Sequence, residues 1–491
     1  MPTVLALDQG TTGSTAVLVG DDGRVLGKGY HEFTQHFPEP GWVEHDPIEI
    51  WQTTMAAARD AVGGQIPDAI GITNQRETVV VWDRVTGRPL HRALVWQDRR
   101  TSARCAELRA ERGDAFIAER TGLVWDPYFS GSKIEWLLRT VPGIRDAAER
   151  GTAVFGTIDA WLVYHLTGGD VLVTDHTNAS RTLLYNINRH HWDDELLELF
   201  GVPRIALPDI RGSSEVVGAT VPDLFGAAVP IAGIAGDQQA ALFGQGCYAP
   251  GDAKNTYGTG AFLLMVVGDH AVPGSAGGGV LTTVACGSAG EPILALEGSV
   301  FIAGAAVQWI RDGLGLVASA AETEALARAI ADTGGVYFVP AFVGLGAPYW
   351  EPAARGTIVG LTRGSGREHL VRAALEAMAY GTKDVLDAMA AASGVSLASL
   401  KVDGGASAND WLMAFQAGVL GVPVRRPDVV ETTALGAAGL AGLASGVWHT
   451  AAEFATTRTY REFRPDGPPI AGGYAGWQRA VQAALFWARE R

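Results

Sequence analysis

Cysteine is scarce in this chain, and the few residues present follow no pattern. Cys105, Cys247 and Cys286 are the only three in 491 residues. They have no metal-ligand spacing and do not form an even set, which excludes the disulfide framework of a small secreted domain. The sequence therefore predicts reduced thiols in a cytoplasmic protein.

The sequence also lacks an excess of basic over acidic residues and a long apolar segment. The formal net charge is −15, which argues against nonspecific binding to nucleic acid or to anionic membranes. The start MPTVLALDQG has no basic segment, and Asp8 interrupts its first apolar run, so no signal peptide is expected. The stretch 434–448 is rich in Ala and Gly and shorter than a membrane span, which predicts a tightly packed helix and no membrane insertion.

Length and periodicity indicate a globular α/β protein of two domains. The apolar content is 47%, and 491 residues exceed what one core usually holds. Apolar periodicity and turn residues predict alternating strands and helices. We place the boundary near 245, giving domains 1–245 and 246–491. The expected helices are 51–62, 101–122, 133–139, 299–314, 369–389 and 432–443. The segments 230–244 and 400–421 are each expected to form a strand, a Gly turn and a helix, 69–83 a strand, a turn and a second strand, and 336–342 a strand.

Two segments far apart in the chain have the same pattern of apolar strand, Gly/Thr turn and apolar strand. They are VLALDQGTTGSTAVLV at 4–19 and AKNTYGTGAFLLMVV at 253–267. The glycines allow the chain to reverse and let backbone N–H groups approach a ligand closely. Two such hairpins facing each other across a cleft would hold a chain of phosphates. The pair suggests a duplication and phosphoryl transfer from a nucleotide.

Two aspartates stand where strands run into turns. Asp8 ends the first apolar strand before its Gly/Thr turn, a place suited to holding Mg²⁺; the alternative is an Asp that caps its own turn. Asp237 follows Gly236 at a strand-to-helix turn. It suits a general base that accepts a proton from an attacking hydroxyl, and the alternative is a helix N-cap.

Other polar and aromatic residues have a functional and an ordinary interpretation. Arg76 and Glu77 lie side by side between two apolar strands. They suit recognition of neighbouring hydroxyls, although adjacent charges more often form a solvated pair. Trp96 and Tyr128 would ordinarily be core aromatics. The glycine turn in Val402–Ala406 suits contact with a nucleotide, but such turns are common.

Taken together, these residues resemble the FGGY carbohydrate kinases. The ordered matches cover some 400 residues, and the stretch Gly41–Pro47 is typical of members that act on glycerol. The other matching segments are Asp8–Thr12, Ile72–Glu77, Gly236–Ala240, Asn255–Gly260 and Gly346–Trp350.

The resemblance implies two actin-like, ribonuclease-H-like domains with the active site in the cleft between them, and ATP-dependent phosphorylation of glycerol to sn-glycerol 3-phosphate. Asp237 would be the general base and Asp8 would lie near Mg²⁺. The substrate-binding residues would be Arg76, Glu77, Trp96, Tyr128, Asp237, Gln238 and Phe262. The nucleotide-binding residues would be Thr11, Thr12, Gly13, Thr259, Gly304, Gln308, Gly405 and Asn409.

The chain departs from many bacterial relatives in two places. Thr15 stands where many relatives have Arg, so we expect a changed KM for the nucleotide with activity retained. The stretch 222–230 has neither the Gly/Arg loop of a fructose 1,6-bisphosphate site nor a His for phosphorylation. We therefore expect both controls to be absent. The resemblance also implies a homodimer or homotetramer.

Three other functions remain open at this stage. The nearest is another FGGY kinase that acts on a larger polyol or a ketose, because it would use the same ATP machinery. A catalytically silent nucleotide-binding or scaffold protein is the second, although both aspartates and both turns are present. A dinucleotide oxidoreductase is disfavoured, because no G-x-G-x-x-G stands in a βαβ unit with a following ribose-binding acid.

Overall fold

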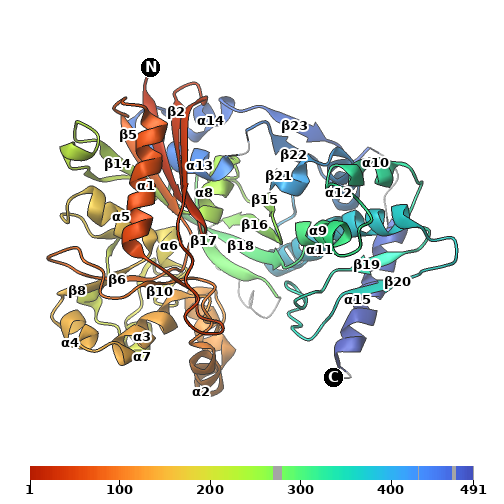
Figure 1. Cartoon of the computed structure of the whole chain (residues 1–491), viewed down its shortest axis with the longest axis horizontal. Helices are drawn as coiled ribbons and strands as arrows, with labels where there is room; N and C mark the ends of the chain where they lie inside the picture. Colours follow the sequence, from red (N-terminus) through yellow and green to blue (C-terminus); the bar gives the residue numbers. More distant parts are fainter. Residues whose placement is uncertain (269–278, 430, 467–470, 490–491) are drawn as a thin grey trace.

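The chain folds around two large β-sheets that lie side by side, each flanked by helices (Figure 1). In this computed structural model the described residues are 1–268, 279–429, 431–466 and 471–489. The first half of the sequence forms the left side of the view and much of the second half forms the right. The predicted α/β architecture is confirmed.

The first sheet has six strands with a parallel centre. β1 pairs antiparallel with β2, so the first predicted hairpin is confirmed, and β5 lies parallel to both β1 and β14. In spatial order the strands are β13 (Ser214–Ala219), β14 (Pro230–Gly236), β5 (Ala69–Asn74), β1 (Thr3–Gln9), β2 (Gly13–Gly20) and β3 (Val25–Glu32).

The second sheet has seven strands and repeats this plan. The second hairpin, β15 with β16, is antiparallel, and β21 runs parallel to β15 as β5 does to β1. In spatial order the strands are β17 (Leu281–Cys286), β18 (Pro292–Val300), β16 (Ala261–Gly268), β15 (Asp252–Tyr257), β21 (Ser399–Gly404), β22 (Val424–Pro427) and β23 (Tyr460–Phe463).

Helices and short strand pairs complete the two units. The helices are α1 (Pro47–Val62), α2 (Ser102–Thr121), α3 (Ser130–Thr140), α4 (Ile144–Glu149), α5 (Ile158–Leu166), α6 (His176–Ala179), α7 (Asp194–Phe200), α8 (Asp237–Gly244), α9 (Gly304–Asp312), α10 (Glu322–Arg328), α11 (Arg367–Ser393), α12 (Asp410–Leu420), α13 (Thr432–Ser445), α14 (Ala451–Thr456) and α15 (Ala471–Arg489). The short strand pairs are β4 (Glu44–His45) with β7 (Ala93–Leu94), β6 (Val80–Asp83) with β8 (Ala153–Gly156), β9 (Val173–Asp175) with β12 (Asp209–Arg211), β10 (Tyr185–Asn186) with β11 (His191–Trp192), and β19 (Tyr337–Val339) with β20 (Thr357–Val359).

Two sequence predictions about these elements need correction. The helix expected from Ser299 begins only at Gly304, because Ser299 and Val300 still belong to β18, where Ser299 pairs with Phe262. The strand expected over 336–342 is limited to Tyr337–Val339. In both cases an apolar run alone does not show where sheet pairing ends.

The helix α13 belongs to the second half of the sequence but packs on the first sheet, against β14, β5 and β1, and it also crosses α8 (Figure 1). Glycines make these contacts close: a Cβ at Gly436 would lie 1.8 Å from the carbonyl oxygen of Ala240, and one at Gly244 would lie 2.0 Å from that of Thr432. The Ala/Gly-rich composition is therefore explained by close backbone packing, and the prediction of a tightly packed helix is confirmed.

The length and apolarity of the helices bear on the prediction of no membrane insertion. No helix in these ranges is both long and apolar enough to cross a membrane. All three cysteines are buried with free thiols.

Candidate functional site

Three parallel strands of the first sheet end at one edge and bring the predicted polar residues together. Asp8 in β1 pairs with Thr73 in β5, and Thr73 pairs with Ala235 in β14. Arg76 is the second residue after β5, and Asp237 directly follows β14. Because parallel strands end at the same edge, residues that are far apart in sequence meet there.

Asp237 is the first residue of α8, and Gly236 is the N-cap. The Oδ1 of Asp237 accepts a hydrogen bond from the backbone N–H of Gln238 at 2.7 Å, and the side chain of Asp237 is 35% exposed. The N-cap interpretation is therefore wrong. An open carboxylate on a rigid turn has the exposure that a proton acceptor needs.

The carboxyl group of Asp8 lies in a place that disfavours its negative charge. Burial, and then the nearby charge of Asp237, raise the pKa of Asp8 to about 7. Among the described residues Asp8 forms no ion pair, and its carboxylate accepts no hydrogen bond from its own turn, so the alternative of an Asp that caps its turn is wrong. A half-buried carboxylate without a partner favours a bound cation. No group of three or more His, Cys, Asp or Glu side chains suited to a metal occurs in the described ranges, so phosphates and water would have to complete a magnesium shell.

Arg76 and Glu77 are 3% and 1% exposed, so the interpretation as a solvated pair is wrong. The Nε of Arg76 lies 3.2 Å from Oδ1 of Asp237 and 3.8 Å from Oε1 of Glu77. Glu77 has a φ of 63°, the left-handed region that few residues with a Cβ adopt. Such strain persists only where surrounding contacts hold it, and it is typical of ligand sites.

Sequence reasoning missed two charged residues that contact this pair. The Nε of Arg181 donates to Oε1 of Glu77 at 2.6 Å. Glu297 in β18 accepts from Nη1 of Arg76 at 2.6 Å and from Nη2 of Arg181 at 2.9 Å. Burial alone would raise the pKa of Glu297, but Arg181 and Arg76 lower it to about 2. Neither residue belongs to a motif that was recognised, so only tertiary structure identifies them.

Lys254 in β15 is a third residue that sequence reasoning missed. Its ammonium group donates to Oε1 of Gln238 and, at 2.8 Å, to Oγ1 of Thr256. Burial lowers the pKa of Lys254, although Asp403 and Asp237 act in the opposite direction. Lys254 thereby fixes one of the predicted substrate-binding residues from the opposite sheet.

The structure brings two of the three predicted wall aromatics together. The rings of Trp96 and Tyr128 are both half-buried and meet edge to face, with centroids 5.6 Å apart. Partial exposure separates them from ordinary core aromatics. Phe262 lies in β16 of the other sheet and makes no ring contact with either of them within the described part of the chain.

The predicted nucleotide residues lie at the ends of β15 and β21 and on the neighbouring helices. The N–H of Gly304, at the start of α9, donates to the carbonyl of Gly258 at 3.0 Å, and a Cβ there would come within 2.5 Å of the same oxygen. Thr259 and Gln308 are exposed, and Gly405 follows β21, whose Gly404 pairs with Tyr257. The remaining residues are Asn409, which caps α12, Thr11 and Thr12 in the β1–β2 turn, and Gly13 at the start of β2.

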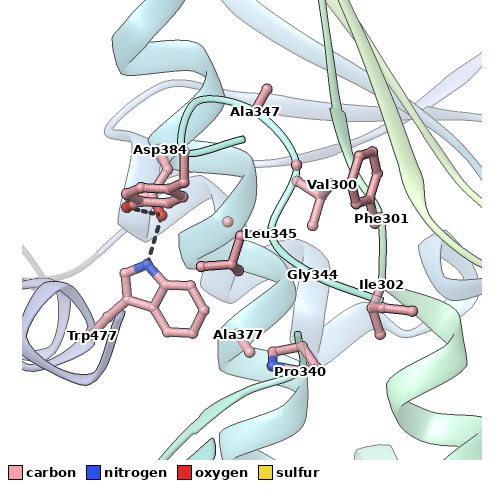
Figure 2. A pocket seen from close by; sticks show the side chains of 13 residues that line it. Val300, Phe301, Ile302, Pro340, Gly344, Leu345, Ala347, Ala377, Asp384 and Trp477 are labelled. Atoms are coloured by element: carbon pink, nitrogen blue, oxygen red, sulfur yellow. Dashed lines mark hydrogen bonds between the residues drawn. The ribbon is translucent and has the colours of Figure 1, made fainter. Parts of the chain in front are cut away.

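The Gly346–Trp350 motif packs against the end of β18 and against Phe301, the next residue. Its Ala347 N–H donates to the carbonyl of Ser299 at 3.0 Å. Figure 2 shows the pocket on this side, in which Trp477 points its indole nitrogen at Asp384, with a hydrogen bond of 2.7 Å. The motif therefore stabilises the end of β18 and the residue that follows it on the way to α9.

The sheet plan, the paired hairpins and the carboxylates at the strand ends define a class of two-domain sugar and polyol kinases. Models of the FGGY family of carbohydrate kinases match residues 3–244 with the N-terminal domain and 253–445 with the C-terminal domain. The chain belongs to the FGGY family of carbohydrate kinases.

Within the family, the chain is similar over its full length to glycerol kinases. It is 58% identical to the glycerol kinase of Symbiobacterium thermophilum, covering 99% of each chain, and 56% identical to that of Deinococcus radiodurans, covering 99% and 98%. A solved structure of Plasmodium falciparum glycerol kinase with ADP matches with a TM-score of 0.94 at 35% identity, covering 99% and 98%. A xylulose kinase from Lactobacillus acidophilus, 21% identical with a TM-score of 0.87 and coverage of 99% and 97%, shares the fold.

Proposed function

We propose that this protein phosphorylates glycerol with ATP and releases sn-glycerol 3-phosphate and ADP. The observation that carries the proposal is the meeting of Arg76, Glu77 and Asp237 at one sheet edge, with Trp96 and Tyr128 paired nearby. Glycerol has three hydroxyls and an apolar C–H surface, which such a set of charged and aromatic groups matches. Sequence identity of 58% to a glycerol kinase over the full length supports the same function.

In the proposed reaction Asp237 acts on the attacking hydroxyl. Its carboxylate accepts the proton as the oxygen attacks the γ-phosphorus, and Arg76, 3.2 Å from Oδ1, holds the carboxylate in place. Arg76 and Glu77 orient the remaining hydroxyls, with Gln238 beside them. Phe262 is the proposed third wall residue, with Trp96 and Tyr128. Phosphoryl transfer depends mainly on alignment and on neutralising charge.

ATP is proposed to lie across both hairpins. Thr11, Thr12 and Gly13 would contact phosphates from one side and Thr259 from the other. Gly304, Gln308, Gly405 and Asn409 would line the nucleotide. Mg²⁺ would be held near Asp8, whose half-buried, unpaired carboxyl suits a cation, and the ion would neutralise phosphate charge.

The test is coupled ADP release from Mg·ATP with glycerol, compared with xylulose, gluconate, ribulose and no acceptor. Strong turnover that depends on glycerol supports the proposal. Turnover with a larger polyol or ketose would keep the ATP site and overturn the roles of Trp96 and Tyr128. No turnover with any acceptor, despite nucleotide binding, would indicate a silent protein.

Several further expectations belong to this proposal. The chain would work as two domains, 1–245 and 246–491, in a cytoplasmic homodimer or homotetramer. Fructose 1,6-bisphosphate would not inhibit it, and a saturable loss of activity in a titration would contradict this. Thr15 pairs with Asp8 across the hairpin, so Thr15→Arg should lower the KM for ATP by supplying a missing cation.

A further inference from the structure

A network of five buried or half-buried charges crosses from one sheet to the other. It runs from Asp237 through Arg76, Glu297 and Arg181 to Glu77. Four members belong to the first half of the chain, and Glu297 comes from β18 of the second sheet. One carboxylate from the second sheet therefore joins the two arginines of the first half.

The carboxylate of Glu297 bridges the two arginines. Oε2 lies 2.6 Å from Nη1 of Arg76, while Oε1 accepts from Nη2 of Arg181 at 2.9 Å and from Nη2 of Arg76 at 3.5 Å. Because one carboxylate binds both guanidinium groups, it sets the separation of the two arginines. Charge-assisted hydrogen bonds of this kind are short and directional.

Arg181 passes this constraint to two further residues. Its Nε binds Glu77 at 2.6 Å, and its guanidinium lies 5.6 Å from the ring centre of Tyr128. Its side chain is fully buried, and its Nη1 has no hydrogen-bond partner among the described residues. If Glu297 is lost, the side-chain hydrogen bond that remains to Arg181 in this part of the chain is the one to Glu77.

We propose that Glu297 is a positioning residue for the polyol, acting through Arg76 directly and through Arg181 on Glu77 and Tyr128. The inference rests on the proposed function and deepens it. Within the described part of the chain the side chain of Glu297 bonds only to the two arginines, so its effect on the polyol passes through them. Since it belongs to the second sheet, the polyol site has its binding geometry only while the two sheets are in contact.

The test is Glu297→Gln in the full chain, with the KM for polyol and for ATP measured separately. The amide keeps the size but cannot carry the charge that holds two guanidinium groups. We expect the KM for glycerol to rise about 10- to 100-fold and the KM for ATP to stay within about twofold. Glu297→Asp keeps the charge on a shorter arm and should recover part of the loss.

A matched control is Glu376→Gln in α11. Glu376 is as buried as Glu297, 6% against 5%, and pairs with Arg372 and Tyr380 of its own helix. The Glu376→Gln variant removes a buried Glu–Arg pair but leaves the charge network around Glu297 intact, so neither the KM for glycerol nor the KM for ATP should change. A glycerol KM in Glu297→Gln that matches the control, or an equal rise in both KM values, overturns the proposal.

Two further measurements cover a variant that does not fold and a substrate other than glycerol. If Glu297→Gln does not fold, Arg181→Lys keeps the charge but cannot reach Glu77 and Glu297 at once, and the same KM split is expected. If the wild-type protein phosphorylates another polyol and not glycerol, the proposed substrate is wrong. The KM for that polyol and the KM for ATP are then compared in the same variants, which still tests the positioning role. An ATP-only effect in Arg181→Lys would overturn the positioning role.

Discussion

The indole Nε1 of Trp96 donates a hydrogen bond to Oγ1 of Thr11 at 3.0 Å. Trp96 belongs to the proposed polyol wall and Thr11 to the first phosphate turn, so one bond joins the two substrate sites. The backbone carbonyl of Thr11 also accepts from Nε2 of Gln35 at 2.9 Å. The turn is therefore held from two sides before any phosphate arrives.

Trp96→Phe should weaken ATP binding. The substitution keeps a ring against Tyr128 and removes the donor to Thr11. A neutral hydrogen bond contributes about 0.5–1.5 kcal/mol, so the KM for ATP should rise about 2- to 10-fold. Steady-state kinetics measure this, with Tyr128→Phe as the control, because Tyr128 makes no bond to the turn. An unchanged ATP KM in Trp96→Phe would show that the bond does not support the phosphate turn.

Asp237→Asn should abolish most turnover while leaving polyol binding. The amide keeps the shape and loses the proton acceptor, so kcat should fall by roughly 10²- to 10⁴-fold. Initial rates at saturating substrates measure kcat. Asp252→Asn, another half-buried aspartate placed at the start of β15, serves as the control. A kcat near that of the wild type would remove Asp237 from the base role.

Asp8→Asn should raise stability and lower activity together. Burial and the charge of Asp237 disfavour the ionised carboxyl, so the neutral amide should raise the Tm of the nucleotide-free protein by about 1–3 °C at pH 8. Activity should fall, and any remainder should need more Mg²⁺. Thermal melts and a magnesium titration of the rate test both parts. A lower Tm with an unchanged magnesium requirement would contradict the assignment.

Asp159→Asn should change how stability depends on pH. Asp159 in α5 is fully buried and accepts hydrogen bonds from the hydroxyls of Thr157 and Thr174. Burial, and then the charge of Asp175, raise its pKa to about 7. Because the unfolded carboxyl ionises near pH 4, the folded state holds more protons between pH 4 and 7, and stability falls as pH rises through that range.

The asparagine variant lacks this titration, so its unfolding free energy relative to the wild type should improve from pH 5 to pH 8 by ~2–4 kcal/mol. Denaturant unfolding at both pH values measures the difference. The same difference at both pH values would mean that Asp159 is ionised throughout. Cys286→Ser is not a suitable control variant, because the charge of Asp175 acts on Cys286 as it acts on Asp159.

Local pattern was enough for the hairpins and for the strand-end residues. Asp8 ends an apolar run before its turn, and Arg76 and Asp237 come shortly after apolar strands; these positions marked each as a candidate, and the family resemblance placed them in one cleft. Glu297 and Lys254 could not be found in this way. Glu297 contacts a residue 221 positions earlier in the chain, and β18 had no turn signal to show where it pairs. The family resemblance supplied Phe262, whose contact with the other aromatics is still a prediction.

The placement of α13 bears on how the protein forms during synthesis. The first sheet is complete in sequence at Gly236, but the helix that covers β1, β5 and β14 begins only at Thr432. Trp448 and Phe454 then join the same core. A ribosome-bound chain must therefore expose that apolar surface for almost two hundred residues of translation, and we expect a fragment ending at 245 to aggregate unless 432–456 is supplied.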